Sequence, residues 1–295
     1  MKYYKAALIT VLCLIIIPGC ASTKKIAFMD IEPGEKIELK YPIVLVHGIA
    51  RNDNLERYRP WSGIPNVLQG CGVEVYFGNT DAWGTIASNA DMLKLSIDNI
   101  MEETGCEKVN IIAHSKGGID SRYCIWKHGY GDKVASLTTI STPHYGSEIA
   151  DLFYNAKIIH TRIIKRRLHI IGKLYGDENP DIYNVNYELT SENMREFSEF
   201  ITADSKVFYQ SIYTIMDNPR DDPMFAYSYI YVRNQSGEND GIVSEKSAHW
   251  GENSVRLPGS ISHEQIIGHG RKKIPGMEIP DIYISMVKEL GKMGY

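Results

Sequence analysis

Ser115 lies in a stretch whose residue types and spacing can support nucleophilic catalysis. Residues 109–118 have the sequence VNIIAHSKGG, an apolar run followed by a small residue, a serine and two glycines. A nucleophilic serine on a sharp strand-to-helix turn has a strained backbone, so the positions two before and two after it must be small. Ala113 and Gly117 meet this requirement. The stretch therefore predicts a nucleophile elbow, with alanine in a place where glycine is usual.

A serine hydroxyl needs a neutral imidazole to accept its proton and a carboxylate to orient that imidazole. Asp240 and His263 follow Ser115 along the chain in the order serine, acid, histidine. Asp240 lies between an asparagine and a glycine, a turn composition that can direct a carboxylate into a cleft. We expect these three side chains to form a catalytic triad.

Other acids and histidines compete for the same two roles. The competing acids lie in a polar stretch that we interpret as a solvated loop, and they are Asp217, Asp221 and Asp222. The competing bases are His249 and His269. A lone histidine is more often a structural residue than a catalyst, so the order along the chain favours His263.

Acyl transfer also needs two backbone donors for the negative oxygen of the tetrahedral intermediate. We expect one to be the N–H of Lys116, which directly follows the nucleophile, and the other to be the N–H of Ile49. His47 and Gly48 precede Ile49, and we expect the His47 side chain to support this loop. The ammonium group of Lys116 is interpreted as a solvated charge near the rim of the cleft.

Strands and helices that position these residues alternate between residues 41 and 141. The pattern predicts strands near 41–46, 73–77, 109–114 and 134–140, and helices near 62–69, 86–101 and 122–127. Such alternation predicts an α/β fold with a mostly parallel central sheet flanked by helices. Ser115, the 47–49 loop and the 141–144 loop each follow a strand, so all three should meet at one edge of the sheet.

Residues 148–222 interrupt this alternation. Isoleucines and leucines between 158 and 174 are interleaved with arginines and lysines, which predicts a basic amphipathic helix or helix pair. Two interpretations stay open: a helix packed on the core with a solvated basic face, or a mobile lid over the active site. The sheet is expected to resume at 224–232 and 254–257, and a helix is expected at 279–290.

The N-terminus has the pattern of an export signal. Two lysines precede an apolar run from Ala6 to Ile17, which is short for a membrane span, and Gly19-Cys20 follows. We expect a signal peptide at 1–20 of the lipoprotein type with Cys20 lipidated, an N-terminal segment at 21–40 and one hydrolase domain at 41–295. The expected location is the cell surface or periplasm. A freely secreted protein and an uncleaved anchor are the alternatives.

Composition and missing motifs exclude several other function classes. The 295 residues have a formal net charge of −4, which gives no support for nucleic-acid binding. Phosphate-loop, dinucleotide-binding and His-Glu-x-x-His zinc motifs do not occur, so we expect no cofactor and no metal. Three cysteines would remain after processing, and we expect Cys71, Cys106 and Cys124 to be small buried side chains.

The chain resembles the bacterial triacylglycerol lipases, especially their clostridial-type members. The matching segments are Tyr41–Gly48, Ala113–Tyr123, Ser141–Ser147, Gly237–Ser244 and Ile261–His263. The resemblance implies an α/β-hydrolase fold with a helical cap or lid, the triad of Ser115, Asp240 and His263, and hydrolysis of the carboxylic esters of lipids. Related pseudomonad-type lipases bind calcium through an aspartate two residues after the catalytic histidine. Gln265 stands there in this chain, so calcium is not implied.

These observations favour an exported serine hydrolase that cleaves lipid esters through an acyl-enzyme and works at a lipid interface or membrane surface. A carboxylesterase, a phospholipase or an acyltransferase on the same triad is the alternative within enzymes. A non-catalytic lipoprotein that binds lipid through residues 158–174 is the alternative outside them.

Overall fold

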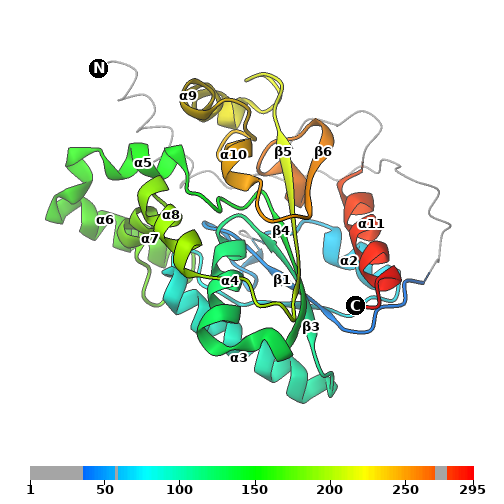
Figure 1. The fold of residues 1–295 in the computed structure, drawn as a ribbon. Helices are drawn as coiled ribbons and strands as arrows, with labels where there is room; N and C mark the ends of the chain where they lie inside the picture. Colours follow the sequence, from blue (N-terminus) through cyan, green and yellow to red (C-terminus); the bar gives the residue numbers. More distant parts are fainter. Residues whose placement is uncertain (1–35, 57–58, 270–277) are drawn as a thin grey trace.

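A six-stranded parallel sheet forms the centre of the molecule (Figure 1). A computed structural model describes residues 36–56, 59–269 and 278–295. The strands are β1 (Ile43–Val46), β2 (Val75–Phe77), β3 (Val109–His114), β4 (Val134–Ile140), β5 (Phe208–Ile215) and β6 (Ser254–Ser260). Their order across the sheet is β2-β1-β3-β4-β5-β6. The carboxyl ends of all six strands therefore lie along one edge.

Helices pack on both faces of the sheet and over this edge. They are α2 (Ile64–Gly70), α3 (Ile86–Thr104), α4 (Lys116–His128), α5 (Glu148–Tyr154), α6 (Arg162–Lys173), α7 (Ile182–Glu188), α8 (Ser191–Phe200), α9 (Ala226–Ser236), α10 (Glu245–Ala248) and α11 (Ile279–Lys292). Short 3-10 helices are η2 (Tyr130–Asp132), η3 (Lys157–His160), η4 (Pro223–Phe225) and η5 (Gln265–Ile267).

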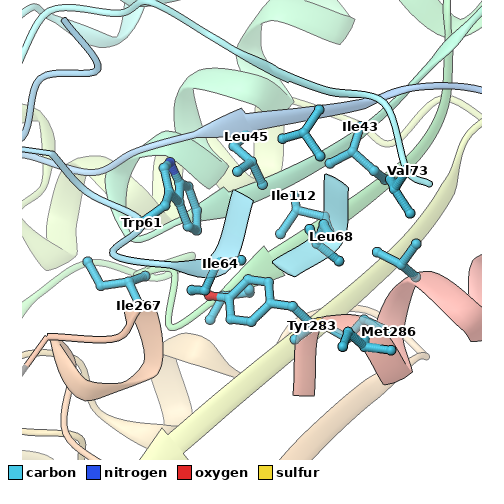
Figure 2. Close-up of a cluster of buried hydrophobic side chains, with 14 of the residues drawn as sticks. Ile43, Leu45, Trp61, Ile64, Leu68, Val73, Ile112, Ile267, Tyr283 and Met286 are labelled. Atoms are coloured by element: carbon cyan, nitrogen blue, oxygen red, sulfur yellow. The ribbon is translucent and has the colours of Figure 1, made fainter. Parts of the chain in front are cut away.

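Alternate residues of the central strands point into two separate cores, because side chains of a strand alternate between its faces. Ile43 and Leu45 of β1 pack with α2 and α11, and the ring of Tyr283 lies in this cluster (Figure 2). Val44 and Val46 pack on the other face with α3 and α4. Burial on both faces explains the continuous apolar run that predicted this strand.

Most of the predicted elements are confirmed, including α3, β3, β4, β6 and α11. The strand predicted at 224–232 is wrong, because this segment forms η4 and α9. The helical segment begins after Asp222, whose side chain accepts a hydrogen bond from the Met224 N–H at 3.1 Å. Pro223 lies in the first turn of η4. The strand beside β4 is β5, inside the segment expected as insertion.

The helices α5, α6, α7 and α8 follow β4 and precede β5 in the chain. They form a cap at the carboxyl edge of the sheet (Figure 1). Phe153, Leu168 and Met194 of the cap pack in one apolar cluster with Trp83 and Ile119 of the remaining domain. The cap helices extend from 148 to 200, and β5 follows within the predicted 148–222 insertion.

Two further predictions concern the chain termini and the cysteines. The predicted signal peptide at 1–20, with Cys20, lies outside the described residues, as does most of the 21–40 segment. No disulfide joins Cys71, Cys106 and Cys124, which all belong to the described part. Cys124 is buried and the other two are half-buried. Of the described helices, none combines the length and the apolar character that a bilayer crossing needs.

Candidate active site

Ser115 lies at a strained turn between β3 and α4. Its φ is 53° and its ψ is −130°, a conformation that side chains other than glycine rarely adopt. The surroundings leave little space: a Cβ on Gly117 would lie 2.4 Å from the carbonyl oxygen of His47, and one on Gly48 would lie 2.7 Å from the Cβ of Ser115. The turn therefore depends on glycine at both positions, and it directs the serine hydroxyl toward the loop after β6.

The three predicted triad residues form one hydrogen-bonded chain. The Nε2 atom of His263 is 3.0 Å from Ser115 Oγ, and its Nδ1 atom is 2.8 Å from Asp240 Oδ2. Because a carboxylate only accepts, the neutral ring carries its proton on Nδ1 and leaves Nε2 to accept from the serine. The other carboxylate oxygen, Oδ1, accepts the N–H groups of Ile242 at 3.0 Å and Val243 at 2.8 Å. These contacts fix both the carboxylate and the histidine tautomer.

All three side chains are buried, with 7% of Ser115, 6% of His263 and 1% of Asp240 exposed. Burial lowers the pKa of His263, but the charge of Asp240 and its hydrogen bond outweigh that effect, so the pKa is raised above its ordinary value of about 6.5. The site thus stabilises the imidazolium that forms when His263 takes a proton.

A second imidazole, His114, lies against His263, with 4.6 Å between the ring centroids. Its Nε2 atom is 3.0 Å from the carbonyl oxygen of His263. Burial and the neighbouring His263 hold the pKa of His114 well below its usual range. His114 therefore stays neutral and supports the backbone of the histidine loop, while His263 alone can carry the proton.

An ion pair links two loops of the site. Arg51, in the loop after β1, pairs with Glu264, which directly follows His263. Burial raises the pKa of Glu264, but the Arg51 guanidinium outweighs it and the pKa is lowered. Sequence reasoning missed this pair, because its members are 213 residues apart and no local pattern relates them.

Of the competing acids, Asp217 is exposed, as expected of a solvated loop, but the other two are not. Asp221 and Asp222 are buried, with 3% and 8% exposed. Asp221 accepts a hydrogen bond from Ser260 Oγ at 2.5 Å, and Asp222 accepts one from Ser262 Oγ at 2.7 Å. Both carboxylates thus hold the backbone that leads to His263.

The competing histidines lie elsewhere. His269 Nε2 is 2.8 Å from the carbonyl oxygen of Pro60, and the His249 ring stacks on Tyr213 at 5.9 Å. These contacts support the loops around the site, whereas the described contact with Ser115 Oγ is made by His263.

The predicted oxyanion donors lie on the loops that flank the serine. Neither the Ile49 N–H nor the Lys116 N–H donates a hydrogen bond to another described residue, so both can serve a ligand oxygen. The buried His47 ring supports the first loop, with Nδ1 2.7 Å from the Gly48 carbonyl and Nε2 3.1 Å from the Thr80 carbonyl. Their role as an oxyanion hole stays a prediction.

The side chain of Lys116 is not the solvated charge that we expected. Only 1% of the residue is exposed, and its Nζ atom lies 2.7 and 2.9 Å from the two carboxylate oxygens of Asp120. The Asn89 amide donates a further hydrogen bond to Asp120 at 3.0 Å. The strand-to-helix turn places Lys116 on the inner side of α4, where the cation needs this partner.

Gln265 lies inside the network that holds the histidine loop. Its Oε1 atom accepts the N–H of Ser262 at 2.9 Å, and its Nε2 atom is 3.4 Å from the carbonyl oxygen of Asp221. Across residues 36–56, 59–269 and 278–295, no group of three or more histidine, cysteine or carboxylate side chains could hold a metal ion. The hydrogen-bonded chain of Ser115, His263 and Asp240 offers nucleophilic and acid–base chemistry.

Comparisons with known proteins agree with this geometry. No protein-family model matches the chain. A triacylglycerol lipase of Pseudarthrobacter phenanthrenivorans is 40% identical over 118 residues, which cover 38% of this chain and 36% of the relative. The match thus spans about a third of that relative. Triacylglycerol lipase 2 of Saccharomyces cerevisiae is 32% identical over 233 residues, which cover 70% of this chain and 66% of the relative.

The fold has a counterpart among solved structures. The lipase of Staphylococcus hyicus matches with a TM-score of 0.70 and 17% identity, over 90% of this chain and 99% of that one. The chain belongs to the lipase family of α/β-hydrolases. The fold predicted from the sequence, a mostly parallel sheet flanked by helices, is confirmed.

Proposed function

We propose that the protein hydrolyses carboxylic esters of lipids through an acyl-enzyme intermediate. The single observation that carries the proposal is the hydrogen-bonded chain from Ser115 Oγ through His263 to Asp240. Ser115 Oγ attacks the ester carbonyl while His263 Nε2 takes the hydroxyl proton. The carbonyl oxygen becomes an oxyanion, which accepts hydrogen bonds from the N–H groups of Ile49 and Lys116.

The second half of the reaction reverses these roles. His263 gives its proton to the leaving alcohol, and the alcohol departs from the acylated serine. A water molecule then attacks the acyl carbonyl as His263 removes its proton. The bond between the acyl carbon and Ser115 Oγ breaks, His263 returns the proton to Oγ, and the carboxylic acid is released. Asp240 accepts the hydrogen bond from His263 Nδ1 and holds the imidazolium in each half.

The cap supports a lipid substrate, because an apolar cluster of its side chains packs beside the oxyanion loop at Ile49. Only 7% of Ser115 is exposed, which supports an element that must move before a long acyl chain reaches the hydroxyl. We therefore propose that the cap is a lid that opens at a lipid interface. Export as a surface lipoprotein through Cys20 is part of the same proposal, and it places the enzyme beside lipid.

The decisive experiment measures hydrolysis of short- and long-chain glycerol esters across their solubility limit, with Ser115→Ala as the control. The proposal expects a jump in rate once an interface forms, and loss of turnover in Ser115→Ala without loss of the fold. Smooth saturation on short esters alone would contradict the lid and favour a carboxylesterase. Parent-level turnover in Ser115→Ala would overturn the assignment.

Two kinds of alternative can be distinguished from this proposal, one by product analysis and the other by covalent labelling. A phospholipase or an acyltransferase uses the same acyl-enzyme, so product analysis with phospholipid and an added alcohol distinguishes them. A non-catalytic lipid-binding lipoprotein would not react with a fluorophosphonate probe. The proposal expects covalent labelling of Ser115.

A further inference from the structure

The cap helix α6 presents an apolar ridge to solvent. Ile163 is 70% exposed, Ile170 is 53% exposed, and Leu174, one residue past the end of the helix, is 63% exposed. Residues seven and eleven positions apart lie on the same helix face, so the three side chains form one line. The opposite face holds Leu168 and Gly172, which are buried in the cap. The ridge therefore points away from the cap core.

Cations surround this ridge. Between residues 155 and 176 the chain has six basic side chains and no acidic one, and they are Lys157, Arg162, Lys165, Arg166, Arg167 and Lys173. The whole chain carries a net charge of −4, so this segment is a local exception. At about 100° per residue, Arg166 and Lys173 flank the ridge on one side and Arg167 on the other.

A cavity lies on the side of α6 opposite the ridge. Its volume is about 450 Å³, and it lies between α6 and the 179–184 segment. Lys165 and His169 line it from the helix, and Lys165 Nζ is 3.4 Å from the centroid of the Tyr183 ring. Its one carboxylate, Asp181, already accepts hydrogen bonds from Asn184 at 3.1 and 2.6 Å. Lys165 thus faces the cavity and Tyr183 rather than the ridge, and the cations beside the ridge are Arg166, Arg167 and Lys173.

We infer that the outward face of α6 docks on the surface of an anionic phospholipid bilayer while the cap is still closed. This inference rests on the lipid-interface part of the proposed function, and it adds the charge of the surface and the face that binds it. A helix with an apolar ridge between rows of cations lies in the plane of a membrane interface. The arginines and lysines contact headgroup phosphates, and the isoleucines and the leucine enter the acyl boundary.

The apolar ridge favours a membrane over another polyanion. A nucleic acid would satisfy the cations but would leave Ile163, Ile170 and Leu174 in water. A neutral bilayer would take up the apolar side chains but would give the cations that flank the ridge no partner. Only an anionic bilayer satisfies both parts of the surface.

The test measures vesicle binding of the full chain carrying Ser115→Ala, so that no lipid is hydrolysed. Vesicles are pure phosphatidylcholine, or phosphatidylcholine with an equal share of phosphatidylglycerol. Arg166→Gln with Arg167→Gln should weaken binding to the anionic vesicles about 30-fold and leave binding to neutral ones unchanged. Ile163→Ser with Ile170→Ser should weaken both by about 10-fold or more. Circular dichroism confirms that each variant is folded.

Matched controls come from elsewhere on the surface. Leu95 on α3 is 60% exposed, and Lys206 has 57% of its side chain exposed. Leu95→Ser and Lys206→Gln should leave vesicle binding unchanged. An environment-sensitive fluorophore on Ile170→Cys should shift to the blue on anionic vesicles, whereas the same label on Leu95→Cys should not. This readout reports α6 itself, whatever the N-terminal segment contributes.

Several results would overturn the inference. One is equal vesicle binding by the parent and by the variant with Arg166→Gln and Arg167→Gln, and another is equal affinity of the parent for neutral and anionic vesicles. The others are a fluorophore at position 170 that does not shift, and binding to duplex DNA that is as tight as binding to anionic vesicles. Turnover of a soluble short-chain ester is measured separately in chains that keep Ser115. Lost docking with intact turnover refutes this inference alone, and intact docking without turnover refutes the proposed hydrolysis alone.

Discussion

Asp240→Asn tests whether the carboxylate fixes the tautomer of His263. Asp240 Oδ1 accepts two backbone N–H groups, at 3.0 and 2.8 Å, so the amide oxygen of an asparagine must stay on that side. Its NH2 group then faces His263 Nδ1, where Asp240 Oδ2 now lies at 2.8 Å. A donor there forces Nδ1 to accept and moves the ring proton to Nε2. The histidine can then no longer take the proton of Ser115.

The size of the effect follows from this reversal. A triad histidine held in the wrong tautomer loses about 10⁴-fold in kcat, which corresponds to about 5 kcal/mol of transition-state stabilisation. The fold should be kept, because Asn is isosteric with Asp and both N–H donors keep their acceptor.

The assay measures kcat on a soluble short-chain ester for the parent, for Asp240→Asn and for a matched Asp222→Asn. Asp222 is also buried and accepts from Ser262 Oγ at 2.7 Å, but it does not contact the imidazole. The matched variant should lose no more than about tenfold, since it disturbs the histidine loop without reversing the tautomer. If Asp240→Asn retained more than a tenth of the parent kcat, the tautomer argument would be refuted.

Three further outcomes follow from the site. Because the pKa of His263 is raised, the acid limb of the pH profile of kcat/KM should have its midpoint above about pH 6.5. Glu264→Gln removes a negative charge that raises this pKa, so it should move the midpoint to lower pH. Lys116→Met should lower the free energy of unfolding in urea by about 3–5 kcal/mol, since it leaves Asp120 buried without its cation, and adding Asp120→Leu should recover most of the loss. Gly48→Ala should lower kcat/KM about 100-fold, because the new Cβ would lie 2.7 Å from the Cβ of Ser115; an unchanged rate would contradict the close packing there.

The sequence was sufficient for much of the sheet and for the residues at its carboxyl edge. Buried parallel strands are continuous apolar runs, so β1, β3 and β4 could be predicted from local pattern alone. Ser115 could be found because its turn constrains its neighbours, and Gly117 and Gly48 are explained by the space around them. Asp240 and His263 could be found from their order along the chain.

Local pattern failed where tertiary contacts decide the structure. The 224–232 segment is rich in aromatic residues, which favour strands, yet it folds as η4 and α9. The helix-start signal of Asp222 followed by Pro223 was present and outweighs that preference. Asp240 therefore follows a helix rather than a strand. The burial of Lys116 could not be predicted, because its partner matters only once α4 packs on the sheet.

Because β6 lies at the edge of the sheet, the protein can lose its active site before the whole domain unfolds. Ser115 follows β3, which has neighbours on both sides. His263 follows β6, which is the edge strand of the sheet in the described residues, pairs there with β5 and has no fully buried residue. Edge elements with few buried contacts open locally at a smaller free energy than the whole domain. Release of this single strand removes the general base while the central strands and the nucleophile keep their places. We therefore expect activity to be lost before the central core unfolds, and we expect substitutions that strengthen the contact between β5 and β6 to prolong activity.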